Sequence, residues 1–174
     1  SVSAFLLNRS SDLVVVTLFI AILDLPTGQM RYCNAGLCAP VIIDTEANLL
    51  PIIPNIPVGL LPHFKYVGQE VIVKPDTTVF MYTDGVTEAE DINHHLFDED
   101  RMMEVARTCL QENHVQPDVL VNEMEESIRK FVKDAEQSDD QTMMAIRYTK
   151  KEEAARLQRH LTLPNNIETI PQLG

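Results

Sequence analysis

Two acidic motifs hold the residues of this 174-residue chain that are best suited to chemistry. Asp84 and Gly85 follow an apolar run that ends at Tyr82. Asp139 and Asp140 come just before a second apolar run. Carboxylates that gather at one place repel one another, and a hard divalent cation such as Mg²⁺ or Mn²⁺ relieves that repulsion through oxygen ligands. The pattern indicates a metal site if the motifs meet, with Gly85 giving a tight turn beside the ion. Otherwise it indicates a plain turn and the start of a strand.

Two other patterns carry weaker signals. Asp91, Asn93 and His95 have the spacing that opens a calcium-binding loop, but Leu96 stands where that loop requires glycine. His94 and His95 are adjacent, so their rings would diverge on a strand or a helix. Without a partner at ligand spacing, they favour a surface loop over a zinc site.

Charge and hydropathy exclude several classes of partner. The chain has 14 Lys and Arg against 26 Asp and Glu, for a net charge of −12. Nucleic acids and anionic lipids both attract basic patches, and the sequence has no run of basic residues. The longest apolar stretch, residues 13–23, is about half as long as a membrane span. We therefore expect no nucleic-acid partner and no direct membrane contact.

The cysteines point to a reducing compartment. Cys33, Cys38 and Cys109 are odd in number and form no Cys-x-x-Cys motif. Such spacing is typical of free thiols rather than of a disulfide framework. The sequence therefore predicts a cytoplasmic location.

The apolar periodicity changes along the chain from strand-like to helical. Residues 98–111 and 117–131 have helical spacing, with Asp98 as a candidate N-cap and Pro117 at a first helical position. Residues 51–62 contain four prolines and predict an ordered loop that crosses the sheet edge. A polar turn is expected at residues 44–48. Strands are predicted at residues 13–23, 29–33, 39–43, 66–73, 77–82 and 142–149. This order predicts an α+β fold with largely antiparallel sheets.

Several strings, taken in order, resemble a known family. Residues 16–19, 24–28 and 32–36 are similar to the front half of the bacterial serine phosphatases of the SpoIIE and RsbU group, which are metal-dependent type-2C protein phosphatases. The resemblance continues through residues 57–60 and ends at residues 137–142. Its most specific parts are Tyr82-Thr83-Asp84-Gly85-Val86-Thr87-Glu88-Ala89 and Ser138-Asp139-Asp140-Gln141-Thr142.

The resemblance implies a fold and a set of metal ligands. The fold would be two packed antiparallel sheets flanked by helices, an αββα sandwich. Two Mn²⁺ or Mg²⁺ ions would activate a water for attack on phosphoserine or phosphothreonine. Asp84 and Asp139 match the metal-binding positions, while Gly85 and Asp140 match positions beside them. No residue is assigned as a further catalytic group.

Two departures from the family pattern bear on activity. The family's earlier Asp-x-x-Gly-x-Gly motif, whose Asp bridges both metals, has no counterpart here, so the domain is expected to be incomplete at its N-terminus. Leu37 stands where relatives often have His after the Asn-Ala-Gly string. We expect this chain alone to bind at most one ion, weakly, and to be inactive.

The resemblance leaves two functions open. In the first, the chain is a phosphatase domain of a bacterial sigma-factor regulatory, partner-switching pathway, and its substrate is a phosphorylated anti-sigma-factor antagonist. In the second, it is a non-catalytic regulatory or scaffold module that keeps the phosphatase fold. Recognition would lie on surface loops, with Glu88 and Asp91 as candidate substrate contacts. Whether the chain forms a homodimer is left open.

The domain organisation follows from the same comparison. Residues 1–149 would form the partial phosphatase domain. Residues 150–159 are charged and typical of a linker, and residues 161–170 are similar to the opening of anti-sigma-factor serine kinases. Residues 150–174 are therefore expected to link the phosphatase to the start of such a kinase.

Overall fold

The computed structural model describes residues 3–7, 15–135, 137 and 139–149. The predicted linker and kinase-like start at 150–174 lie outside these residues. No helix in the described part is long and apolar enough to cross a membrane.

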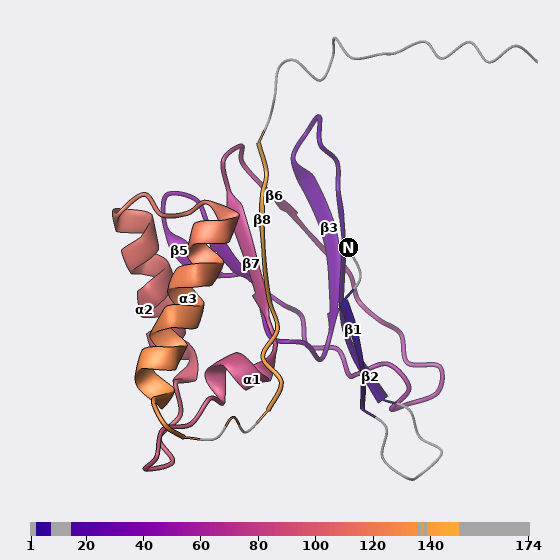
Figure 1. Ribbon diagram of the computed structural model, residues 1–174. Helices are drawn as coiled ribbons and strands as arrows, with labels where there is room; N and C mark the ends of the chain where they lie inside the picture. Colours follow the sequence, from indigo (N-terminus) through magenta and orange to yellow (C-terminus); the bar gives the residue numbers. More distant parts are fainter. Residues whose placement is uncertain (1–2, 8–14, 136, 138, 150–174) are drawn as a thin grey trace, which may run out of the picture.

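Two four-stranded antiparallel sheets form the sandwich (Figure 1). The first, sheet A, has the order β1-β2-β3-β6, and the second, sheet B, has the order β5-β4-β7-β8. Sheet A is built from β1 (Ser3–Leu7), β2 (Val15–Leu23), β3 (Gln29–Ala35) and β6 (Gln69–Ile72). Sheet B is built from β4 (Val41–Ile43), β5 (Ala47–Leu49), β7 (Thr78–Tyr82) and β8 (Met143–Arg147). The predicted α+β class and the pair of antiparallel sheets are confirmed.

Three helices lie in the described part: α1 (Asp84–Thr87), α2 (Asp98–Gln111) and α3 (Pro117–Val132). In Figure 1, α2 and α3 pack on the side of sheet B that faces away from sheet A. Their apolar stripes, at the helical spacing that the sequence predicts, join the strands of sheet B in one core. Its fully buried members include Val41, Phe80, Met102, Leu120 and Met124.

A second core lies between the two sheets. Phe19, Met30 and Tyr32 from sheet A meet Leu50, Val73 and Tyr148. These residues alternate along β2 and β3 with outward-pointing ones, as expected for a strand with one buried face. The inter-sheet core fixes the position of sheet B, and with it the ends of β7 and β8.

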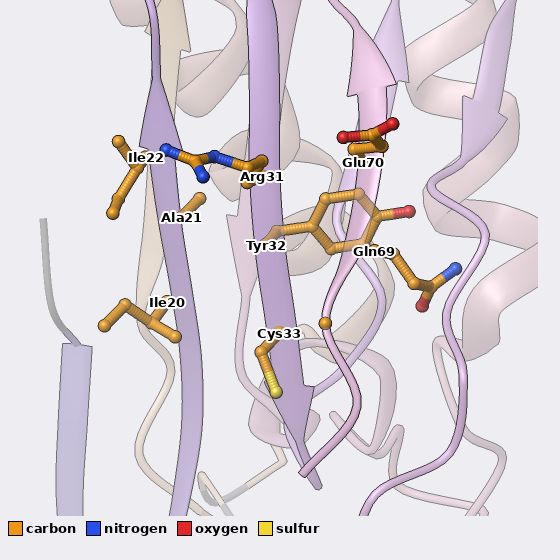
Figure 2. A pocket seen from close by; sticks show the side chains of 9 residues that line it. Ile20, Ala21, Ile22, Arg31, Tyr32, Cys33, Gln69 and Glu70 are labelled. Carbon is orange, nitrogen blue, oxygen red and sulfur yellow. The ribbon is translucent and has the colours of Figure 1, made fainter.

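The outer face of sheet A carries no helix from the described residues. Ile20, Ile22 and Ile72 are 43%, 62% and 63% exposed there. Figure 2 shows Ile20 and Ile22 on β2 beside Arg31 and Cys33 on β3, where they line a shallow pocket of about 380 Å³. The expected helical flanking is thus seen on sheet B, and the outer face of sheet A presents exposed isoleucines together with the charged Arg31 and Glu70.

Several short elements differ from the sequence-based expectation. The polar turn expected at residues 44–48 ends earlier, because Ala47–Leu49 pairs with β4 as β5. The proline-containing loop does reach the sheet, since Val58 forms a bridge with Val16 beyond the end of β3. The helix predicted at residues 98–111 is confirmed with those bounds. Asp98 opens it, and its carboxylate accepts the backbone N–H of Arg101 at 3.0 Å.

Candidate metal centre

The two acidic motifs meet at one end of sheet B. Strands β7 and β8 are antiparallel neighbours, and Tyr82 lies opposite Met143. The residues that follow β7 therefore lie beside those that precede β8. In Figure 1, α1 and the segment leading into β8 lie at the same end of the sandwich. The juxtaposition on which the metal hypothesis depends is thus present.

Thr83 joins the two motifs through three hydrogen bonds. Its backbone N–H donates to the carbonyl of Thr142 at 3.1 Å. Its hydroxyl accepts the N–H of Thr142 at 3.1 Å and donates to the carbonyl of Asp140 at 3.3 Å. Thr83 is only 9% exposed, so these bonds are shielded from competing water. They extend the β7–β8 pairing up to the acidic residues.

Gly85 is required by a close approach rather than by a turn. A Cβ atom at this position would lie 2.4 Å from the carbonyl oxygen of Asp140 and 3.0 Å from its carbonyl carbon. The φ angle of Gly85 is not in the left-handed region, unlike that of Gly28, Gly36 and Gly59. The expected tight turn is therefore not the reason for this glycine; only a residue without a side chain lets α1 approach the second motif so closely.

Asp84 and Asp139 are both exposed at this end of the sheet. One oxygen of each carboxylate accepts the backbone N–H of the next residue, from Gly85 at 3.1 Å and from Asp140 at 2.7 Å. These bonds restrain each carboxylate and leave its second oxygen without a hydrogen bond to the described residues. Exposed carboxylate oxygens fit Mg²⁺ or Mn²⁺, which keep several water ligands.

The number of ligands limits what this centre could hold. Within residues 3–7, 15–135, 137 and 139–149, no group of three or more His, Cys, Asp or Glu side chains is arranged to hold a metal ion. Two carboxylates completed by water suit a single ion. Asp84 and Asp139 are thus the candidate ligands that the described residues offer at this end of sheet B, and two carboxylates fall short of the ligand set of a dinuclear centre.

Asp140 holds the two acidic motifs together through its backbone carbonyl rather than through its exposed carboxylate. Its carbonyl accepts the Thr83 hydroxyl and packs on Gly85, so it sets the distance between the motifs. Gln137 adds a further tie, because its side-chain Nε2 donates to the carbonyl of Asp139 at 2.7 Å.

Glu88 and Asp91, the candidate substrate contacts, differ in their surroundings. Glu88 is exposed directly after α1, with its N–H donating to the carbonyl of Asp84 at 2.8 Å. Asp91 accepts the N–H groups of Asn93 and His95 at 2.8 and 2.9 Å and contacts the His95 ring at 3.1 Å. The backbone bond from His95 is the main cause that lowers the pKa of Asp91 far below its ordinary value. The Asp91 carboxylate thus holds its own turn together.

Cys38 is a neighbour of the centre that the sequence analysis did not single out. The pKa of its thiol is raised to about 11, mainly by burial and next by the nearby carboxylate of Asp84, with smaller contributions from Glu88 and Glu99. Burial also raises the pKa of Tyr82, with Cys38 as the next cause. No spacing in the sequence indicates this proximity, because Cys38 precedes β4 and Asp84 follows β7.

Leu37 supplies no ligand at the position where relatives often have His. Its backbone N–H donates to Asn34 Oδ1 at 2.9 Å, and its carbonyl accepts Asn34 Nδ2 at 2.8 Å. Its side chain packs against the inter-sheet core. The turn after β3 is thus held by the buried Asn34, and the side chain at 37 serves packing.

A family model and a curated protein both match this chain. The model described as "Stage II sporulation protein E (SpoIIE)" matches residues 1–149. Protein IcfG of Synechocystis sp. is 27% identical over 131 residues, which make up 75% of this chain and 20% of that protein. The chain thus spans about a fifth of the length of this relative.

Solved structures share the fold at low sequence identity. The phosphatase domain of SpoIIE from Bacillus subtilis has a TM-score of 0.59 and 17% identity, over 78% of this chain and 57% of that one. The SiaA-PP2C domain of Pseudomonas aeruginosa has a TM-score of 0.63 and 18% sequence identity, over 77% of this chain and 52% of that one. The structure of the RsbU and RsbW domains of a Mycobacterium tuberculosis protein has a TM-score of 0.62 and 20% sequence identity, over 81% of this chain and 42% of that one. The chain covers about half of these structures. With the sandwich and both acidic motifs in place, the resemblance seen in the sequence is confirmed: this chain belongs to the SpoIIE family and has the type-2C phosphatase fold.

Proposed function

We propose that this chain is part of a metal-dependent protein serine/threonine phosphatase. The observation that carries the proposal is the contact of Gly85 with the Asp140 carbonyl, which brings Asp84 and Asp139 to one end of sheet B. The two acidic motifs are held together in three ways: by the pairing of β7 with β8, by the hydrogen bonds of Thr83, and by the absence of a Cβ at Gly85.

Asp84 and Asp139 would hold Mn²⁺ or Mg²⁺ through their free oxygens. When bound, the ion would supply Lewis-acid activation of a water and charge neutralisation at a phosphoryl group. The chain's own residues prepare for this. The N–H groups of Gly85 and Asp140 orient the two carboxylates, and Thr83 keeps the motifs from separating. The full family site of two ions would require further carboxylates beyond the described residues.

The proposed substrate is a folded protein that carries phosphoserine or phosphothreonine, namely a phosphorylated anti-sigma-factor antagonist. The neighbouring structure that holds RsbU and RsbW domains together supports a partner-switching role. The exposed proline-containing loop at 51–62 and the exposed segment at 92–96 offer surface for such a partner. The three free cysteines agree with the proposed cytoplasmic location.

A scaffold role is the second candidate, and two observations favour it. The described residues contain no cluster of three metal ligands. Leu37 is also committed to packing, at a position where relatives often have His. A module that keeps the fold without the chemistry would bind the same partner and leave its phosphate in place.

The test uses the full gene product with Mn²⁺ and a phosphoserine-bearing antagonist protein. Asp84→Asn and Asp139→Asn should each lower turnover more than about 100-fold, since outer groups that merely support metal ligands already cost about 10–100-fold. Asp24→Asn is the matched control, because the turn after β2 lies at the opposite end of the sandwich (Figure 1). If the unaltered protein binds the antagonist but releases no phosphate from it, the scaffold role is established instead.

A further inference from the structure

The loop at residues 51–68, between β5 and β6, gathers apolar side chains on its surface. It carries as many exposed large apolar side chains as the rest of the described chain together: Ile52, Ile53, Val58, Leu60, Leu61, Tyr66 and Val67. Single exposed apolar residues are common on protein surfaces, but a concentration of them on one segment is typical of an interaction site.

Hydrogen bonds and prolines hold the 51–68 loop in one conformation. The side-chain Nδ2 of Asn55 donates to the carbonyls of Asn34 and Val67 at 2.9 and 3.1 Å, and its Oδ1 accepts the N–H of Val67 at 2.9 Å. Val58 and Val16 exchange two backbone hydrogen bonds of 2.8 Å. Four prolines fix φ at further positions. The exposed side chains are therefore presented by an ordered backbone, and docking on it costs little conformational entropy.

The 51–68 loop lies at the same end of the sandwich as the acidic motifs. Pro57 packs on Gly36, where a Cβ would come within 2.7 Å of the Pro57 Cγ. Gly36 is followed closely by Cys38, and the carboxylate of Asp84 is one cause of the raised pKa of that thiol. In Figure 1 the loop passes beside the start of β2, at the end that also holds α1. A folded protein that presents a phosphorylated side chain to Asp84 and Asp139 is thus within reach of this loop.

Charge on this loop differs from charge on the chain as a whole. Residues 51–69 contain no Asp or Glu, although the net charge of the chain is −12. Their basic residues, His63 and Lys65, are exposed. A phosphoserine adds about −1.5 to −2 charges to its protein, so a surface rich in carboxylates repels it. The 51–68 loop offers such a partner apolar area without a like charge of its own.

We propose that the 51–68 loop is the docking surface for the folded phosphoprotein substrate, with Leu60 and Leu61 as its apolar anchors. These two side chains are 47% and 57% exposed and follow Gly59, whose φ of 92° turns the chain outward. The inference rests on the proposed function and adds the chemistry of the partner, which would carry an apolar patch near its phosphorylated residue. Because the loop holds none of the acidic motifs, it determines affinity and leaves the chemical step to the metal centre.

The first measurement is of binding without turnover. The full gene product is titrated in a calorimeter with the phosphorylated antagonist protein in buffer free of Mn²⁺. Leu60→Asp with Leu61→Asp should weaken binding roughly tenfold or more, because the change removes buried apolar area and adds like charge. Leu60→Met with Leu61→Met keeps the apolar area and should bind as the unaltered protein does.

Leu25→Asp is the matched control. Leu25 is 64% exposed and lies in the turn after β2, at the opposite end of the sandwich (Figure 1). This substitution adds the same charge to a similarly exposed leucine and should leave the dissociation constant unchanged. Melting curves confirm that each variant is folded.

The second measurement is of steady-state kinetics with Mn²⁺. Leu60→Asp with Leu61→Asp should raise KM for the phosphoprotein roughly tenfold and leave kcat unchanged. The same variant should hydrolyse a small aryl phosphate as fast as the unaltered protein does, because that substrate makes no contact with the loop. A merely structural role of the two leucines would lower turnover of both substrates.

The outcomes separate this inference from the proposed function. Values of Kd and KM that match those of Leu25→Asp overturn the docking surface even if the phosphoprotein is hydrolysed, and so does an unaltered protein that does not bind the antagonist. Binding that the aspartate substitutions weaken, in a protein that releases no phosphate, supports the docking surface and counts against the phosphatase function.

Discussion

Gly85 is the residue at which the two acidic motifs come closest, and this gives a direct prediction. Gly85→Ala places a Cβ 2.4 Å from the Asp140 carbonyl oxygen, so α1 and the segment before β8 must move apart. We expect a loss of about 1–3 kcal/mol in the free energy of unfolding, as is typical of overpacking, measured by urea denaturation.

Gly68→Ala is the matched control for that measurement. A Cβ at Gly68 would lie 3.5 Å from the Tyr32 carbonyl oxygen, which is an ordinary contact. Equal stability of the two variants would contradict the close approach at Gly85.

Cys38 reports on the charge of the acidic end. Because a carboxylate disfavours a thiolate nearby, Asp84→Asn should lower the Cys38 pKa from about 11. The thiolate fraction at pH 8 then rises, and alkylation by iodoacetamide should become severalfold faster, measured by mass spectrometry of the Cys38 peptide. Burial is the larger cause and persists, so the thiol should remain slow to react. An unchanged rate in Asp84→Asn, equal to that of Asp24→Asn, would refute the proximity.

Single residues show what the sequence can and cannot predict about this centre. The sequence alone indicated that Asp84 and Asp139 could lie close together, because each stands at the end of an apolar run and antiparallel strands bring such ends together. The roles of Thr83 and Cys38 could not, because both depend on contacts between segments far apart in the chain. Gly85 was identified, but for a turn rather than for its approach to Asp140.

At the scale of elements, the two long helices were predicted well, and the short elements β5 and α1 were missed. The helix at residues 98–111 has its predicted bounds, and α3 ends one residue later than expected. Strand β5 has three residues and α1 has four, which is too few for either periodicity to be visible. β5 exists because β4 pairs with it, and that is a tertiary cause.

The segment at 90–96 gives a prediction at this scale. Ala89 and Phe97 belong to the core, so only residues 90–96 can be replaced without loss of packing. A Gly-Ser segment of equal length in the full gene product should reduce turnover of a phosphoprotein more than turnover of an aryl phosphate, because it removes surface and leaves the acidic motifs intact. Steady-state kinetics on both substrates test this. Equal losses on the two would argue against a recognition role.

At the scale of the whole molecule, the outer face of sheet A departs from an evenly covered sandwich, because no helix of the described residues packs on it. Ile22 and Ile72 lie on this face, whereas Ile92 is 68% exposed on a loop. Ile22→Lys with Ile72→Lys should reduce the fluorescence of a bound apolar dye more than Ile92→Lys does, because the face of sheet A gathers several exposed isoleucines, whereas Ile92 lies on a loop. A similar decrease in both would mean that the face does not act as one surface.

The central claim is that the two acidic motifs form one site for a divalent cation. Calorimetric titration of this 174-residue chain with Mn²⁺ tests it most directly. We expect one ion per chain, bound weakly, because two carboxylates and water are the ligands that the described residues offer. Asp84→Asn and Asp139→Asn should each abolish the binding heat, and Asp24→Asn should retain it. Two tightly bound ions, or one ion still bound after both acidic substitutions, would contradict the account.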